Sequence, residues 1–265
     1  MKQTINTTLA QAKRMGAPRA IALCQCFNGA LEYQAGHWVE AEAALNESIR
    51  LYRELRAASG EAIAWQRLGV LQTARGQIET AMRSFEEGIA IAERAVMRAH
   101  CQVRLYASMT RNRLIVGDLQ AAEQYLSLGL EMSESHGNCA TCNALLLPAA
   151  ISLRIAQGEL RQAEPLCWQL ERCAEEYASS MWLAMARQSR GELLAAQNWT
   201  EEALKRYEEA YRFYRAAGHD YEAARCLSAI ADLHEVRCTS QDDQRAVDYR
   251  RRARTLFDRL GVVSP

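Results

Sequence analysis

The residues with the clearest chemical potential in this 265-residue chain are cysteines and histidines near its middle. The segment His136-Gly137-Asn138-Cys139-Ala140-Thr141-Cys142 contains a Cys-x-x-Cys pair preceded by a histidine. Two thiolates at this spacing can chelate one soft metal ion, and an imidazole is a further ligand that Zn²⁺ accepts. Two alternatives remain open for the same residues. They can form a redox-sensitive dithiol, or they can be inert buried thiols that pack as small apolar side chains.

Other cysteines and a histidine are expected at the same edge of the molecule. Cys101 and Cys142 each lie 16 residues before a glycine, Gly117 and Gly158 respectively, so they occupy equivalent positions in consecutive segments. If these segments are helical hairpins, antiparallel packing should return Cys173 to that edge. The predicted Zn²⁺ ligands are Cys139, Cys142, Cys173 and His136, with His100 and Cys101 as alternates.

The elements that must position these residues are repeated. At five places a small or polar residue is followed five positions later by an alanine, and successive places are 40 or 41 residues apart. The five pairs are Gly36–Ala41, Gly76–Ala81, Gly117–Ala122, Gly158–Ala163 and Asn198–Ala203. A constant period of about 20 to 50 residues is typical of a stacked array of one supersecondary unit.

The composition favours helices and argues against several classes of partner. The chain has only 4 prolines in 265 residues and is 49% hydrophobic, as expected of a folded, largely helical protein. Lys+Arg and Asp+Glu both number 32, so we expect no binding to nucleic acid or to a membrane surface. The polar N-terminal segment and the absence of a long apolar run predict a cytoplasmic protein with reduced cysteines.

The small residues within each unit predict close helix packing. In the second unit, Gly69 and Ala81 lie 12 residues apart, and Phe85 and Gly88 follow on the second helix. Small side chains at these positions let the two helices of a hairpin approach each other. This pattern resembles the tetratricopeptide repeat (TPR), and the resemblance extends over residues 20–260.

The resemblance implies an all-α, superhelical solenoid of about six antiparallel helix-turn-helix hairpins. We expect residues 20–265 to form this single domain and residues 1–19 to form a leading helix or a frayed N-terminus. The period exceeds the usual TPR length of about 34 residues. Such long repeats are similar to the TPR arrays of bacterial transcription regulators and signalling ATPases, although no Gly-x-x-x-x-Gly-Lys-Ser/Thr loop occurs in this sequence.

A solenoid of this kind presents the first helix of each hairpin on its concave side. The positions expected to face a partner there are Tyr33, Gln66, Thr73, Arg104, Arg111, Ser152, Gln188 and Glu192. Arg104 and Arg111 are seven residues apart and therefore share one helix face, where together they could hold a carboxylate or a phosphate. The alternative is that these arginines pair with Glu192 or with other carboxylates across the groove.

The sequence predicts a non-catalytic protein, because it contains neither Gly-x-Ser-x-Gly nor His-Glu-x-x-His. By resemblance, we expect a scaffold in bacterial regulation or signalling that binds a protein or peptide partner, or a small effector, in its concave groove. Self-association through terminal hairpins is left open. The alternative function is metal or thiol-redox sensing through the edge that carries His136, Cys139 and Cys142.

Overall fold

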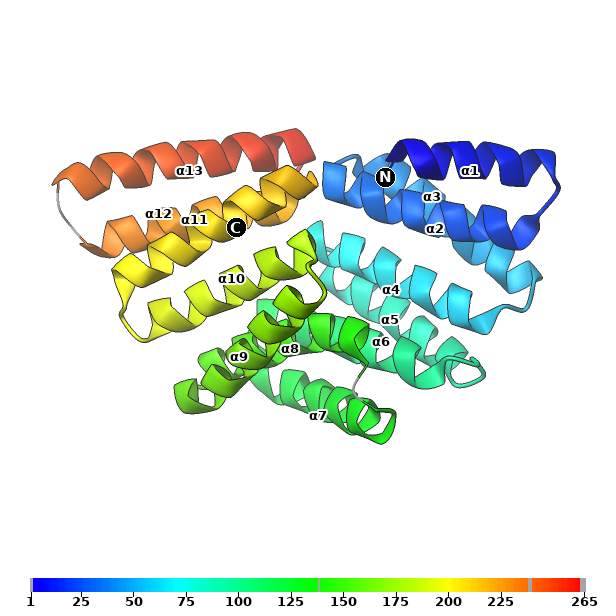
Figure 1. Cartoon of the computed structure of the whole chain (residues 1–265), viewed down its shortest axis with the longest axis horizontal. Helices are drawn as coiled ribbons and strands as arrows, with labels where there is room; N and C mark the ends of the chain where they lie inside the picture. Colours follow the sequence, from blue (N-terminus) through cyan, green and yellow to red (C-terminus); the bar gives the residue numbers. More distant parts are fainter. Residues whose placement is uncertain (1, 138, 238–239, 263–265) are drawn as a thin grey trace. The chain divides into compact units, whose positions relative to one another are not determined.

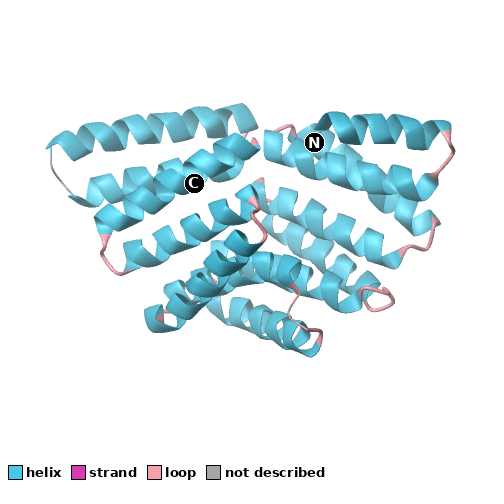
Figure 2. Ribbon diagram, viewed as in Figure 1, coloured by secondary structure: helices cyan, strands magenta, loops and turns pink. Residues whose placement is uncertain are grey.

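The computed structural model describes residues 2–137, 139–237 and 240–262. All regular secondary structure in these ranges is helical and none of it is strand, which confirms the predicted all-α class (Figures 1 and 2). The helices fall into two compact units, Met1–Cys142 and Asn143–Pro265. Within the described ranges, no helix is long and apolar enough to cross a bilayer.

The first unit consists of seven helices and the beginning of an eighth. They are α1 (Lys2–Arg14), α2 (Pro18–Ala35), α3 (Trp38–Glu54), α4 (Ala58–Ala74), α5 (Ile78–Ala92), α6 (Arg98–Ile115), α7 (Leu119–Ser135) and the first residues of α8 (Ala140–Ala156). Helix α1 lies within the predicted leading segment. Helices α2 and α3, α4 and α5, and α6 and α7 pack as three consecutive hairpins.

The second unit continues the same pattern from the remainder of α8. Its further helices are α9 (Leu160–Glu176), α10 (Ser180–Ala196), α11 (Thr200–Ala217), α12 (Asp220–Arg237) and α13 (Ser240–Leu260). Helices α8 and α9 share an apolar cluster, and α10 with α11 and α12 with α13 pack as hairpins. The prediction of about six helical hairpins is therefore confirmed.

The five predicted turn residues all end a helix in the left-handed conformation. The φ angles are 83° at Gly36, 76° at Gly76, 73° at Gly117, 77° at Gly158 and 64° at Asn198. Glycine adopts this conformation without steric cost, and asparagine tolerates it better than most residues. The 40- or 41-residue period of the sequence is thus the spacing of these helix ends.

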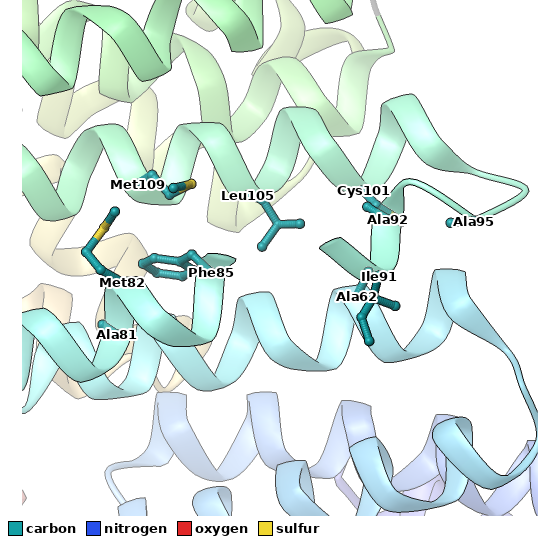
Figure 3. Close-up of a cluster of buried hydrophobic side chains, with 10 residues drawn as sticks. All are labelled: Ala62, Ala81, Met82, Phe85, Ile91, Ala92, Ala95, Cys101, Leu105 and Met109. Carbon is teal, nitrogen blue, oxygen red and sulfur yellow. The ribbon is translucent and has the colours of Figure 1, made fainter. Parts of the chain in front are cut away.

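The predicted close packing within hairpins is also present. A Cβ atom added to Gly69 would lie 2.3 Å from the ring of Phe85, which is fully buried. Figure 3 shows Phe85 on α5 among Met82 of the same helix and Leu105 and Met109 of α6. The glycine therefore lets α4 rest against an aromatic ring that the next hairpin holds in place.

We predict that Gly69→Ala destabilises the protein by about 1–3 kcal/mol, because the added Cβ would lie 2.3 Å from the fully buried Phe85 ring and force it to shift. Urea unfolding followed by circular dichroism measures this. The matched variant is Gly191→Ala, whose added Cβ would lie 3.2 Å from Tyr207, and we expect it to cost less. Equal stability of Gly69→Ala and the wild type would contradict this account, since alanine otherwise favours a helix over glycine.

A buried ion network joins α9 to α10 in the second unit. The Arg190 guanidinium donates to both carboxylate oxygens of Glu171, at 3.0 and 2.8 Å, and to Glu164 at 2.5 Å. Its Cζ atom also lies 5.0 Å from the ring centroid of Trp168. Burial disfavours the charged guanidinium, but the hydrogen bonds to the carboxylates outweigh burial and raise the Arg190 pKa.

We predict that Glu171→Ala lowers the free energy of unfolding by about 3–5 kcal/mol, because it leaves a buried arginine without its bidentate partner. The control is Glu175→Ala on the same helix, whose exposed carboxylate lies 3.8 Å from Arg187 and should contribute less than about 1 kcal/mol. Chemical unfolding of both variants provides the comparison. Similar losses for the two would show that Arg190 does not depend on Glu171.

Candidate functional site

The first helices of the three hairpins in the first unit are joined directly by polar contacts. Gln66 of α4 donates to the Ser108 hydroxyl of α6 at 2.8 Å, and Arg67 of α4 donates to the Cys26 carbonyl of α2 at 2.7 Å. We call the surface of α2, α4 and α6 that carries Phe27, Arg67 and Arg104 the inner face. The side chains on it come from positions about three or four residues apart on each helix.

Arg104 is the most unusual residue of the inner face. Its Nε atom is buried and has no hydrogen-bond partner. Burial lowers the pKa of the Arg104 guanidinium, and the nearby positive charge of Arg67 lowers it further. Within the described part of the first unit, neither arginine forms an ion pair with a carboxylate. The two guanidinium charges are therefore near enough to interact, and within the described first unit neither is paired with a carboxylate.

Among the described residues, Arg104 lacks the carboxylate partners that Arg190 has in the second unit. Arg190 is buried, whereas Arg104 is half-buried with a buried Nε atom, and two glutamates satisfy Arg190 and raise its pKa. A buried charge is normally paired, because removing it from water costs several kcal/mol. Arg104 is partly removed from water and, within the described first unit, has no carboxylate partner, so its site favours an added anion.

Apolar side chains border the two arginines. Leu23 and Phe27 are one helical turn apart on α2 and are 49% and 42% exposed. The Arg67 Cζ atom lies 4.8 Å from the centroid of the Phe27 ring, a cation–π contact. The inner face thus offers a positive centre next to exposed hydrophobic surface.

Further polar atoms on the same three helices are unsatisfied. Gln66 is only 4% exposed and its Oε1 atom has no partner, although its Nε2 atom donates to Ser108. The Oδ1 atom of Asn28 on α2 and the Nε1 atom of Trp65 on α4 are also buried without partners. Buried polar atoms are usually paired with protein, water or ligand. Trp65, however, packs against the apolar cluster around Phe85, so of the residues with such atoms only Arg104 is assigned to the inner face here.

Other predicted partner residues of the first unit take part in its internal packing. The Tyr33 ring stacks on Trp38 with a centroid separation of 6.2 Å. The Thr73 hydroxyl donates to the Gly69 carbonyl and accepts from Asn112 of α6 at 3.0 Å. Arg111 is half-buried. Their contact with a partner stays a prediction.

The predicted partner residues of the second unit form a hydrogen-bonded set. The Glu192 carboxylate accepts from the Ser152 hydroxyl at 2.8 Å and from the Gln188 amide at 3.4 Å. Gln188 also accepts from the buried Tyr214 hydroxyl. These bonds hold the three side chains in fixed positions. Their role in binding, and the alternative pairing of Glu192 with Arg104 or Arg111, both stay predictions.

Arg67 and Phe27 were not among the predicted partner residues. Arg67 lies four residues after Ile63 and three before Val70, so the helical period alone could have placed it on the face that carries them. The sequence contains no signal that distinguishes an arginine paired with a carboxylate from one that is unpaired. That difference depends on which carboxylates the fold brings within reach.

A second group of reactive side chains lies at one end of the first unit. His100 is in the first turn of α6, Cys139 directly precedes α8 and Cys142 is in its first turn. The His100 Nδ1 atom lies 3.2 Å from Cys142 Sγ and 3.8 Å from Cys139 Sγ, and the three atoms are all within 4.8 Å of one another. We call these three residues the thiol–imidazole cluster.

The two thiols of the cluster have different environments. Cys142 is 1% exposed, and burial together with the neighbouring Cys139 raises its pKa to about 12. Cys139 is exposed. Its partial burial raises the pKa, but hydrogen bonds from Thr141 and Cys142 outweigh that effect and hold the Cys139 pKa below its usual value. Burial lowers the pKa of His100, and the positive charge of Arg104 lowers it further.

The structure brings together only part of the predicted ligand set. Cys139 and Cys142 are joined by the alternate His100, whereas the exposed His136 directs its Nδ1 atom to the Ser135 hydroxyl and the Met132 carbonyl. The buried Cys101 thiol lies 3.6 Å from the Ser59 carbonyl. Cys173 is half-buried in the second unit, and its role as a ligand stays a prediction.

A hollow of about 870 Å³ occurs in the second unit, on a different set of helices. It lies along α11, α12 and α13, and its lining includes Lys205, Glu208, His234, Arg237, Asp248 and Arg252. Charges of both signs line it and pair with each other in part, as Arg252 does with Asp248.

Comparison with known proteins identifies the repeat family. The model of the MalT-like TPR region matches residues 19–227. A search of curated proteins found no match. Among solved structures, the crystal structure of BtubC (BKLC) from P. vanneervenii has a TM-score of 0.57 and 15% identity, with 89% of this chain and 94% of that chain covered. This likeness shows the fold alone. Because the family model covers most of the sequence, the chain belongs to the MalT-like TPR family.

Proposed function

We propose that this protein is a non-catalytic TPR scaffold that binds an anionic group of a peptide or protein partner on the inner face of its first unit. The observation that carries the proposal is the pair formed by Arg67 and Arg104, with the Arg104 Nε atom buried and unpartnered. A carboxylate or a phosphate is the chemical group that would complete this site. A small anionic effector is the alternative ligand.

In the free protein the Arg104 Nε atom is left without a hydrogen-bond partner among the described residues. The desolvation cost of the Arg104 guanidinium is already part of folding, so a ligand anion gains the hydrogen bonds without removing that group from water again. Hydrogen bonds to charged groups contribute about 1.5–3 kcal/mol each. Leu23 and Phe27 add apolar contact for side chains next to the anion. A peptide with a terminal carboxylate or a phosphoserine near hydrophobic residues fits both features.

The proposed setting is bacterial regulation or signalling in the cytoplasm. Membership of the MalT-like TPR family supports a role as a helical repeat scaffold in a regulator. In such arrays a ligand that contacts neighbouring hairpins favours one packing of them over another, and so alters the surface offered to a second protein. The inner face meets this requirement, because α2, α4 and α6 belong to three different hairpins.

We predict that Arg104→Met raises the free energy of unfolding by about 1 kcal/mol, because it replaces a half-buried charge whose Nε atom has no partner with an apolar side chain of similar length. Arg190→Met is the matched control and should destabilise the protein, since that arginine is paired with Glu171 and Glu164. Urea unfolding of both variants measures the difference. Strong destabilisation by Arg104→Met would show that the guanidinium already has a partner.

Binding is tested with a library of fluorescein-labelled random heptapeptides and the full chain. The best binder is then prepared with a free C-terminal carboxylate, as its amide, and as its amide with an internal phosphoserine. We expect at least one anionic form to bind, and Arg67→Ala and Arg104→Ala each to weaken that binding about 10- to 100-fold, as the loss of a charged hydrogen bond requires.

The control variant is Arg50→Ala, which removes an exposed arginine paired with Glu47 and Glu54 and should leave the affinity unchanged. Fluorescence anisotropy gives the dissociation constants, and circular dichroism verifies that each variant is folded. A neutral amidated peptide that binds as tightly as its anionic forms would refute the proposal. So would an affinity that is the same in Arg104→Ala and the wild type.

A further inference from the structure

We propose that His100, Cys139 and Cys142 form a binding site for one Zn²⁺ ion at the start of helices α6 and α8. The site is separate from the proposed anion site, which uses neither thiol and no histidine. Its ligand atoms would be His100 Nδ1, Cys139 Sγ and Cys142 Sγ, which lie within 4.8 Å of one another. No other side chain of the described residues belongs to this group.

The separations of the ligand atoms suit a tetrahedral ion. Bond lengths of about 2.3 Å for Zn–S and about 2.0 Å for Zn–N place two ligands of one tetrahedron about 3.5–3.8 Å apart. The His100 Nδ1 atom lies 3.2 Å from Cys142 Sγ and 3.8 Å from Cys139 Sγ, and all three atoms are within 4.8 Å of one another. Binding would therefore require movements of no more than about 1 Å, within the range of side-chain rotation.

The helical hairpin explains why these residues meet. Helix α7 runs antiparallel to α6 and returns the chain to the end of the unit where α6 begins. His100 is in the first turn of α6, and the Cys139–Cys142 pair enters α8 at the same end. A metal there would close a loop of about 40 residues, from His100 to Cys139 and Cys142, and stabilise the closure of the α6–α7 hairpin.

Zn²⁺ binding would leave this site without net charge. Each thiol releases its proton as its Zn–S bond forms, so the two thiolates neutralise the dication and the imidazole binds as a neutral ligand. Three protein ligands leave a fourth position for water or for an exogenous group. The alternatives are a Cys139–Cys142 disulfide and two inert thiols. The convergence of one imidazole nitrogen on both sulfur atoms is the observation that favours the metal site over these alternatives.

The test uses the full chain, reduced and stripped of metal, and titrated with Co²⁺ and then Zn²⁺. We expect one Co²⁺ per chain, with the visible absorption of a tetrahedral site and a thiolate-to-cobalt charge-transfer band that Zn²⁺ abolishes. Two protons per Zn²⁺ should be released. Zn²⁺ should also protect Cys139 and Cys142 from alkylation by iodoacetamide, which mass spectrometry of the peptides detects.

The variants Cys139→Ala, Cys142→Ala and His100→Ala should each weaken Zn²⁺ binding at least about 100-fold. The matched control is Cys101→Ala, because Cys101 neighbours His100 but its thiol lies near the Ser59 carbonyl. This variant should bind Co²⁺ with an unchanged spectrum. His136→Ala and Cys173→Ala complete the set. Weakened binding in either one, in addition to the three ligand variants, would support the site and identify its fourth ligand.

Three results would overturn the proposal. The first is the absence of the charge-transfer band at Co²⁺ concentrations well above that of the protein. The second is metal binding that persists in Cys142→Ala, which would place the ion among other cysteines. The third is a Cys139–Cys142 disulfide that forms in air while the reduced protein binds no metal, which would establish a redox pair instead.

Discussion

The close approach of the two helices in each hairpin is the constraint on which the rest of the structure depends. It requires small residues at matched positions, as where Gly69 meets the ring of Phe85 and Gly191 meets that of Tyr207. It also requires a sharp reversal, which left-handed residues such as Gly117 provide. Because hairpins of this kind recur with nearly the same spacing, the first helices α2, α4 and α6 of the first unit recur in equivalent positions and build a common face.

That face explains why polar chemistry concentrates on α2, α4 and α6. The apolar side of each helix is buried in hairpin packing. The opposite side can therefore carry polar residues that bind a partner. Two arginines illustrate the result. Arg190 is buried, is satisfied by Glu171 and Glu164, and joins α9 to α10. Arg104 is half-buried, its Nε atom has no partner, and burial and the charge of Arg67 both lower its pKa. Charged groups that are removed from water without a partner lower stability, and they are found at binding sites more often than in structural cores.

The thiol–imidazole cluster follows from the same geometry at the ends of the helices. In an array of antiparallel hairpins, the first turns of α6 and α8 lie at one edge, so a residue at the start of one repeat can meet a residue at the start of the next. Such an edge allows a few side chains to join two hairpins without altering the apolar packing between them. The inner face and the cluster use different side chains of the first unit, although Arg104 lies one helical turn from His100 and its charge lowers the His100 pKa.

The sequence by itself determined the repeat period, the turn residues and the all-α class, because these depend on local backbone preference and on side-chain volume at fixed spacing. It also indicated that Cys139 and Cys142 belong together, since both are in one short segment. Only the tertiary structure placed His100 rather than His136 beside those thiols, and revealed Arg67 next to Arg104. Those pairings depend on the direction of individual side chains and on which charges lie within a few ångströms across neighbouring helices, and a one-dimensional period does not contain that information.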